Sequence, residues 1–406
     1  MPPTIDPARL RRRLEELAQI GRTPEGGVTR LSYRAEHAAA VRLAARWMGE
    51  AGATPGVDAW GNLHGLVPGA EAGLPPVAAG SHLDTVPNGG IFDGALGVVA
   101  AIEAAQALRD AGAHLARPLL LLGFAEEEGT SFGVGCLGSL AVVGRAPAPE
   151  TIHDHEGVTV AALLRAFDPG VARVPLPPAM AAYLELHIEQ GPVLASRGVP
   201  LAAVEAIVGI ERAVFTFRGQ ANHAGTTPMD ARRDALWGAA DLVAQVRDLA
   251  RGTEGRAVAT VGRLSVSPGA TNVVPGAVEM TVEIRSAEVP ILETLRAAVE
   301  QAGRTSAGRY ELGLEMTAWR AEPPVPLDGN VRASIEQAAG DLGWPIMTMP
   351  SWAGHDAKIL CARAPAGMIF VPSDRGISHS PEEHTSWEDA ARGAQVLCRT
   401  IERLAA

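Results

Sequence analysis

Hydrophobic positions along the chain alternate between helical and strand-like spacing. Apolar residues recur at helical intervals in three segments, residues 6–18, 36–51 and 94–111. Short apolar runs predict strands at residues 77–80, 118–125 and 181–185. The run at 118–125 is typical of a central strand buried on both faces. This alternation indicates an α/β fold in which helices cover both faces of a sheet.

The middle of the chain has a different order of elements. Strands are predicted at residues 204–218, 257–266, 273–285 and 310–319, and helices at 231–250 and 291–302. This order, strand-helix-strand-strand-helix-strand, predicts a ferredoxin-like α+β sandwich. After Pro323 and Pro324 the αβ alternation returns and ends in a helix at 385–404. We therefore predict a first domain in two parts, residues 1–206 and 321–406, with a second domain, residues 207–320, inserted between them.

Composition and charge exclude several classes of protein. The 406 residues carry a formal net charge of −11, and no stripe of lysine and arginine offsets it, which argues against nucleic acid as a partner. The longest apolar run is too short to cross a bilayer. Because the chain opens without a signal-peptide pattern and its three cysteines lack CxxC spacing, we expect reduced thiols and a cytoplasmic location.

Five short stretches offer side chains that can bind a metal ion. These side chains are His82, Asp93, Glu128, His187 and His379, with the acids Asp84, Glu126 and Glu127 beside them. His82, Glu128 and His187 lie at or just past the ends of predicted strands, where open α/β sheets bind ligands. Taken singly, each stretch also has a structural interpretation, such as a core histidine, a turn or a polar loop. Three adjacent glutamates, however, repel one another and favour a neutralising cation.

Together the five side chains can hold two divalent ions if the carboxylate of Asp93 bridges them. A site of nitrogen and oxygen ligands suits Zn²⁺, Mn²⁺, Co²⁺ or Ni²⁺, and we expect Zn²⁺ first although residue identity does not choose among them. Asp84 is placed to accept the second ring N–H of His82 and to fix its tautomer. Of the adjacent glutamates, one can bind an ion while its neighbour takes a proton from the shared water.

Longer motifs carry a resemblance to a known family. Residues 80–87 read GSHLDTVP, 187–192 HIEQGP, 222–229 NHAGTTPM, 271–276 TNVVPG and 354–357 GHDA. In these motifs the chain resembles the amidase/carbamoylase branch of the M20 metallopeptidase family. That branch comprises N-carbamoyl-L-amino-acid hydrolases, β-ureidopropionases, allantoate amidohydrolases and ureidoglycolate amidohydrolases. The resemblance covers almost the whole chain, and HIEQGP and HAGTTPM are specific to this branch.

The resemblance implies a catalytic domain with two metal ions, formed by residues 1–206 and 321–406. In it, His82, Asp93 and His187 hold one ion, and Asp93 bridges to a second ion that Glu128 and His379 hold. Glu127 matches the general base, whereas Glu126 has no assigned role. The inserted domain, residues 207–320, is expected to be a lid that also forms a homodimer.

The resemblance also implies a set of residues that bind the substrate. In the lid, His223 would polarise the scissile carbonyl, and Asn272 with Arg285 would hold the substrate carboxylate. The family places His223 and Asn272 at an active site across a dimer interface, with the lids pairing edge to edge. An arginine at the end of a strand suits bidentate carboxylate recognition, although an exposed charge is its structural alternative. Gln190, Gly354 and His355 are expected to be further substrate contacts.

The predicted reaction is hydrolysis of a C–N bond in a small ureido substrate that carries a carboxylate. An N-carbamoyl-L-amino acid is favoured, which would give an amino acid, ammonia and carbon dioxide. Allantoate or ureidoglycolate is the alternative substrate; an aminoacylase or dipeptidase, or a catalytically silent ligand-binding homologue, is more distant. Ser131, Ala195 and Lys358 stand where the branch commonly has Arg, Glu and Gln. The first and third of these departures weaken any naming of the substrate.

Overall fold

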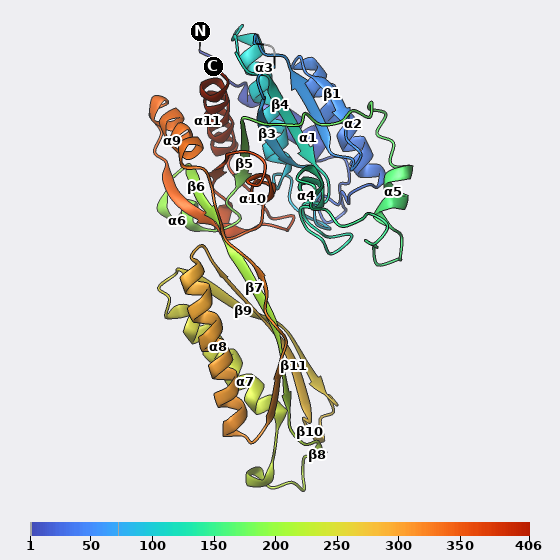
Figure 1. Ribbon diagram of the computed structural model, residues 1–406, viewed down its shortest axis with the longest axis vertical. Coiled ribbons are helices and arrows are strands. Elements are labelled where there is room, and N and C mark those ends of the chain that lie inside the picture. The colour runs from blue at the N-terminus through green and yellow to red at the C-terminus, as the bar shows by residue number, and fades with distance from the viewer. Residues whose placement is uncertain (1, 72) are drawn as a thin grey trace. The chain divides into compact units, whose positions relative to one another are not determined.

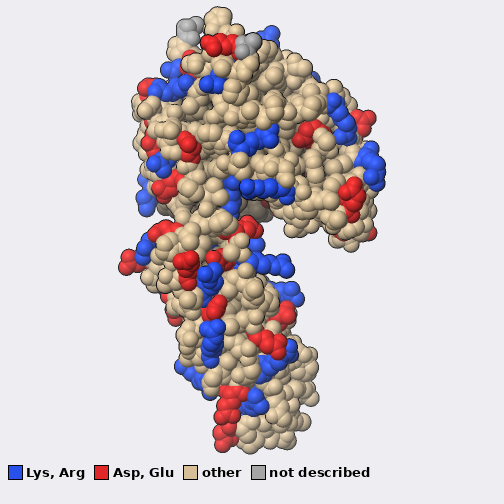
Figure 2. Space-filling model, in the orientation of Figure 1, with Lys and Arg blue, Asp and Glu red and all other residues tan. Residues whose placement is uncertain are grey.

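The computed structural model describes residues 2–71 and 73–406. Met1 and Ala72 lie outside the described residues, and Met1 belongs to the N-terminal segment that was predicted to lack a signal peptide. The described residues form two compact units (Figure 1). The first unit contains the chain up to Glu205 and again Leu327–Ala406, and the second contains Ala206–Pro326. No helix among the described residues combines the length and apolar composition needed to cross a membrane. On the face shown in Figure 2, acidic and basic side chains are interspersed.

The larger sheet is mixed, as the predicted fold class requires. In the described part of the chain its nine strands follow the order β1-β2-β4-β3-β5-β16-β6-β14, with β15 paired to β6. The central strands β4, β3, β5 and β16 are mutually parallel, and β2 and β6 join them in the antiparallel sense. The strands are β1 (Thr54–Val57), β2 (Leu63–Val67), β3 (Val77–His82), β4 (Leu119–Phe124), β5 (Ala182–Ile188), β6 (Ala202–Ile207), β14 (Val325–Pro326), β15 (Met347–Ser351) and β16 (Ala366–Val371).

Strand β5 shows how this sheet separates the hydrophobic core from the polar site. Leu184, Leu186 and Ile188 belong to a core that also contains apolar residues of helices α3 and α11. Because successive side chains of a strand alternate, Glu185 and His187 point to the other face, where α10 begins. The helices of the first unit are α1 (Pro7–Leu17), α2 (Ala35–Glu50), α3 (Ala95–Asp110), α4 (Leu137–Val142), α5 (Val160–Ala166), α6 (Val193–Arg197), α9 (Gly329–Asp341), α10 (Asp356–Leu360) and α11 (Trp387–Ala405).

The second unit is an antiparallel sheet packed against two helices, in the predicted α+β order. Its strand order is β12-β7-β11-β9, with β13 also paired to β7. Phe215, Phe217 and Ile284 from the sheet pack with Leu242 of α7 and Val299 of α8. The elements are β7 (Gly209–Arg218), β8 (Asn222–His223), α7 (Ala235–Arg251), β9 (Ala257–Ser267), β10 (Val273–Val274), β11 (Ala277–Ser286), α8 (Val289–Arg309), β12 (Gly313–Met316) and β13 (Arg320–Glu322).

Three predicted elements have different bounds in the structure. The predicted strand 204–218 is two strands, because β6 pairs with β16 whereas β7 pairs with β11 in the other sheet. The predicted strand 273–285 is interrupted at Pro275, which has no N–H to donate to a neighbouring strand. The predicted strand 310–319 shrinks to β12, because α8 continues to Arg309 and is longer than predicted.

Candidate metal centre

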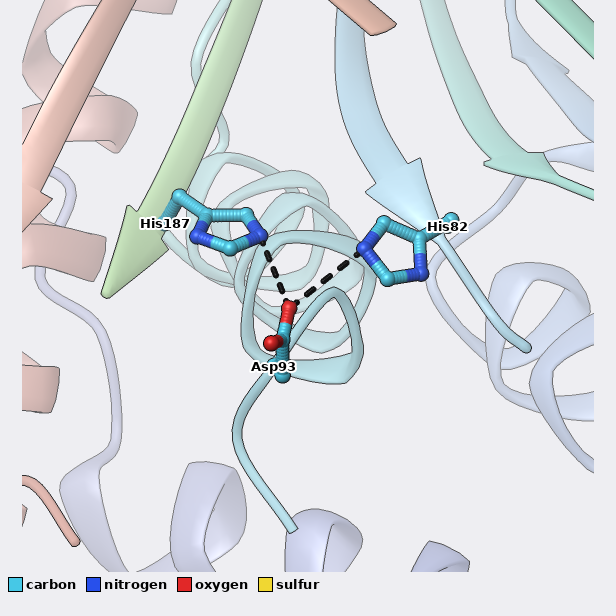
Figure 3. A group of neighbouring side chains, drawn as sticks. All are labelled: His82, Asp93 and His187. Atoms are coloured by element: carbon cyan, nitrogen blue, oxygen red, sulfur yellow. Dashed lines mark ion pairs between the residues drawn. The ribbon is translucent and has the colours of Figure 1, made fainter. Parts of the chain in front are cut away.

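Three of the predicted ligands meet beyond the ends of two parallel strands. His82 is the last residue of β3, His187 lies on the neighbouring β5, and Asp93 lies in the loop before α3 (Figure 3). Asp93 Oδ1 is 3.1 Å from His187 Nε2 and 3.5 Å from His82 Nε2. Both imidazoles are only 2% exposed. The fold therefore builds a buried inner cluster with two ring nitrogens facing one carboxylate oxygen.

The other two predicted ligands meet at the second oxygen of the same aspartate. His379 Nε2 is 3.3 Å from Asp93 Oδ2 and 3.4 Å from Glu128 Oε2. The side chain of His379 is 50% exposed, so this outer cluster is open to solvent on one side. Each oxygen of Asp93 thus faces a different pair of ligands, which is the arrangement that a bridging carboxylate requires.

Backbone carbonyls fix the orientation of the two inner imidazoles. Nδ1 of His82 is 3.0 Å from the carbonyl oxygen of Asp84, and Nδ1 of His187 is 2.9 Å from that of Ile188. Each Nδ1–H therefore donates to the backbone, so Nε2 is the ring nitrogen that faces Asp93 and can bind an ion once it has lost its proton. This corrects the expectation for Asp84, because its carboxylate lies 3.8 Å from His82 Nδ1.

The Asp84 carboxylate instead holds the glutamate loop. It accepts the backbone N–H groups of Glu127 and Glu128 at 3.1 and 3.2 Å. Glu126, which the sequence left without a role, turns away from the clusters and accepts the amides of Ser131 and Phe132. Glu126 therefore stabilises the turn of the glutamate loop through the amides of Ser131 and Phe132. Asp84 fixes the backbone of Glu127 and Glu128 and thereby the direction of their side chains.

Glu127 lies beside the inner cluster. Its Oε2 is 3.8 Å from His82 Nε2, and its Oε1 accepts a weak hydrogen bond from the thiol of Cys136 at 3.4 Å. Burial, helped by the charges of Asp356 and Glu128 and opposed by His82, raises the pKa of Glu127 well above its usual value. A carboxylate with a raised pKa beside a candidate metal cluster is suited to general-base chemistry.

The electrostatics of the two clusters match a cation site. Burial, followed by the charge of Asp93, raises the pKa of Glu128 to about 7. Burial lowers the pKa of His82, but the hydrogen bond that its ring donates to Asp93 and the charges of Glu127, Asp84 and Asp93 outweigh burial, so this pKa lies well above its usual value. These groups hold protons that bound cations would displace. Two buried oxygens, Oε1 of Glu128 and Oε1 of Gln190, have no hydrogen-bond partner among the described residues. The ligand types and the unpartnered Glu128 oxygen therefore fit a divalent metal.

A residue that the sequence did not single out positions Asp93, the aspartate that both clusters share. Glu383 is 5% exposed, and its Oε1 accepts the backbone N–H groups of Phe92 and Asp93, each at 3.0 Å. Ser378 Oγ lies 2.8 Å from Glu383 Oε2 and 3.0 Å from Asp93 Oδ2. Gly90 is required here, because a Cβ on it would lie 2.0 Å from Glu383 Oε1. Glu383 thus ties the loop of Asp93 to the loop of His379.

The predicted contacts Gln190 and His355 also lie at this centre. Gln190 Nε2 donates to Asp93 Oδ2 at 2.8 Å. The ring of His355 packs edge-on against His187 with centroids 4.5 Å apart, and its Nε2 is 2.8 Å from Ser351 Oγ. Burial, followed by the charge of His187, lowers the pKa of His355 well below its usual value. Gly354 is exposed in the loop before it.

Comparison with known proteins agrees with the motifs and the geometry. Residues 78–403 match the family described as Peptidase family M20/M25/M40. The chain belongs to this family. Membership, together with the two ligand clusters, implies that this M20 protein takes divalent metal ions. The resemblance inferred from the sequence motifs is confirmed.

Relatives of this M20 protein are similar over almost their full length. It is 40% identical to an N-carbamoyl-L-amino acid amidohydrolase of Geobacillus stearothermophilus, covering 99% of both chains. It is 34% identical to an allantoate amidohydrolase of Escherichia coli (strain K12), covering 96% of both. A crystal structure of an amidase of the hydantoinase/carbamoylase family from Burkholderia multivorans superposes with a TM-score of 0.94 at 34% identity, covering 99% of this chain and 98% of that one.

The predicted substrate residues of the M20 protein's second unit have distinct local surroundings. Nδ1 of His223 accepts the amides of Gly225 and Thr226 at 3.0 and 3.3 Å. Asn272 is exposed, and its carbonyl accepts the amide of Ala224. Arg285, at the end of β11, donates from its Nε to Glu283 Oε1 at 2.7 Å, and its side chain is 28% exposed.

The three departures from the branch pattern lie in different surroundings. Ser131 donates its amide to Glu126 and so belongs to the glutamate loop. Ala195 is exposed on α6, and Lys358 is partly buried on α10. Ser131 is therefore bonded to Glu126, the residue that precedes the predicted general base.

Proposed function

We propose that this protein hydrolyses the C–N bond of N-carbamoyl-L-amino acids and releases the amino acid, ammonia and carbon dioxide. The observation that carries the proposal is Asp93, whose two oxygens face two separate pairs of ligands with Glu127 beside them. The 40% identical relative from Geobacillus stearothermophilus, named an N-carbamoyl-L-amino acid amidohydrolase, supports the choice of substrate.

The proposed ligands are His82, Asp93 and His187 for one ion and Asp93, Glu128 and His379 for the other, with Zn²⁺ as the expected metal. When bound, two such ions would lower the pKa of a water molecule from about 16 towards roughly 7. Glu127 takes the proton of the attacking water and passes it to the leaving nitrogen. The backbone amides that Asp84 accepts keep the Glu127 and Glu128 carboxylates in place during this transfer.

Substrate recognition is proposed for residues of both units. Gln190 keeps its Nε2 on Asp93, so its unpartnered Oε1 can accept an N–H of the ureido group. Because Nδ1 of His223 accepts two amides, its Nε2 carries the proton and can donate to a carbonyl oxygen. Arg285 lines a cavity of about 490 Å³ together with Arg212, Arg263 and Glu283, and Glu283 pairs with both Arg212 and Arg285. Three guanidinium groups and one carboxylate leave this wall with a positive charge that suits the substrate carboxylate, with Asn272 as a further polar contact.

We also propose a homodimer that forms through the second unit. Strand β9 ends the order of its sheet, and Val258 and Leu264 on it are 45% and 41% exposed. An edge strand of this kind presents unpaired backbone groups to another chain. Cys136, Cys361 and Cys398 are all free, which supports the expected cytoplasmic location.

Replacement of the general base tests the proposed reaction. Glu127→Gln should abolish ammonia release from N-carbamoyl-L-amino acids, while the metal content stays near two ions per chain. Glu156→Gln, at a side chain 65% exposed, is the matched control and should retain full activity. Unchanged turnover in Glu127→Gln would refute the assignment. Allantoate and ureidoglycolate in the same ammonia assay, and N-acyl-amino acids in an assay for the released amino acid, separate the alternative substrates.

A further inference from the structure

A cavity of about 200 Å³ lies in the first unit next to Gln190. Its walls come from three segments far apart in the sequence: the start of α6, strand β15 with the turn after it, and strand β16. Its apolar lining includes Pro192, Val193, Met349, Trp352, Ala353 and Phe370. None of the predicted metal ligands lines this cavity, and neither does the predicted general base.

The cavity adjoins the metal centre on two sides. Gln190, which lines it, donates to Asp93 Oδ2 at 2.8 Å. Phe370 is paired with His187 in the register of β16 and β5. Its ring lies 5.7 Å from that of His355, which in turn packs against His187. Only the side chain of Gln190 therefore separates a group held in the cavity from Asp93, the aspartate that both candidate metal clusters share.

The carboxylate of the acidic residue in the cavity wall is hydrogen-bonded to backbone amides. Glu189 is 8% exposed, and its two oxygens accept the backbone amides of Val193 and Leu194 at 2.8 and 2.7 Å. Its carboxylate is thus committed to the first turn of α6. The remaining lining residues present mainly carbon atoms, so the cavity favours an apolar group over a charged or hydrogen-bonding one.

We propose that this cavity binds the side chain of the substrate, and that the preferred substrates are N-carbamoyl-L-amino acids with a large apolar side chain. This inference rests on the proposed function. In such a substrate only one nitrogen and one carbon separate the ureido carbon from the side chain, a short separation that suits a cavity sharing Gln190 with the metal centre. An apolar cavity of roughly 150 Å³ holds benzene, so the cavity accepts a phenyl or isobutyl group.

The same cavity disfavours the alternative substrates. Allantoate carries a second ureido group and ureidoglycolate a hydroxyl group where an amino acid carries its side chain. Either group would lose its hydrogen bonds to water on entering an apolar cavity. One methylene in such a pocket changes kcat/KM about 10- to 200-fold. N-carbamoyl-L-phenylalanine and N-carbamoyl-L-leucine should therefore exceed N-carbamoyl-L-alanine at least tenfold in kcat/KM.

The test combines a substrate panel with two variants that fill the cavity from different segments. kcat/KM of the metal-loaded enzyme is measured by ammonia release with the phenylalanine, leucine and alanine derivatives, allantoate and ureidoglycolate. Val193→Phe and Ala353→Phe should each lower the phenylalanine-to-alanine ratio of kcat/KM by tenfold or more. Val174→Phe adds the same bulk at a position 41% exposed and outside the cavity, and should leave the ratio unchanged.

The outcomes separate the two proposals. If no compound of the panel releases ammonia, the proposed function fails. If ammonia is released but the alanine derivative, allantoate or ureidoglycolate matches the phenylalanine derivative, the proposed reaction class survives and the side-chain assignment is overturned. The assignment is also overturned if both filling variants fold and bind metal but keep the ratio of the unmodified enzyme.

Discussion

Removal of the Glu383 carboxylate should weaken the outer metal site. Glu383 accepts the amides of Phe92 and Asp93 at 3.0 Å and a hydrogen bond from Ser378, and Ser378 also contacts the Asp93 oxygen that faces Glu128 and His379. In Glu383→Ala these buried amides lose their acceptor, and the loop that carries Asp93 loses its link to the loop that carries His379.

The expected size of the effect follows from the bonds that are lost. Hydrogen bonds to a charged group each contribute about 1.5–3 kcal/mol. Loss of a residue that orients a ligand typically weakens metal affinity about 10- to 100-fold, which corresponds to about 1.4–2.8 kcal/mol. The metal affinity of the outer cluster should fall more than that of the inner cluster, because Ser378 bonds Oδ2 of Asp93 and because His379 is already half exposed.

Metal content and affinity measure this effect directly. Protein stripped of metal is titrated with Co²⁺, followed by its visible absorption, and ions per chain are counted after dialysis. Glu383→Ala should keep close to one ion where the unmodified protein keeps two, and Glu383→Gln should lie between them. Glu382→Ala is the matched control, since that neighbour is 67% exposed and pairs only weakly with Arg375 at 3.4 Å. Two ions bound with unchanged affinity in Glu383→Ala would contradict the reasoning.

Two further predictions concern stability and assembly. Burial, followed by the charge of Arg30, lowers the pKa of His37 to about 3, below its unfolded value of about 6.5, so the unfolded state binds the extra proton and stability falls as the pH drops from 6.5 towards 3. The loss of stability is about 2 kcal/mol at pH 5. The urea unfolding midpoints at pH 7 and pH 5 should therefore differ less in His37→Asn than in the unmodified protein. The control is His155→Asn, which changes a histidine that is 82% exposed and should keep the pH dependence of the unmodified protein. Leu264→Lys on the edge strand β9 should shift a dimer to monomer in sedimentation, whereas Val174→Lys, at an equally exposed position of the first unit, should leave the dimer intact.

The sequence alone predicted that the side chains at the ends of neighbouring strands lie close together in the centre. His82 and His187 end or nearly end buried parallel strands, and the glutamates follow a third, so their proximity follows from the direction of the chain alone. Glu383 was beyond reach, because Glu382 and Glu383 are equivalent in sequence and the bond from Asp93 spans 290 residues. The acceptor of His82 was predicted wrongly for a related reason. A strand pattern places Asp84 two residues after His82, but it does not tell whether the carboxylate or the backbone carbonyl of Asp84 faces the His82 ring.

The backbone of the centre shows why local rules stop being predictive there. Glu126, Gln190 and His379 have φ values of 57°, 60° and 56°, in the left-handed region that residues with a Cβ avoid. No propensity places glutamate, glutamine or histidine in that conformation, so the surroundings must impose it. The fully buried Ser32 Oγ accepts the amide of Glu126, and the equally buried Ser373 Oγ accepts that of Gln190. Two serines remote in sequence thus hold the strained turns that aim the glutamate loop and Gln190, and only the folded chain brings them there.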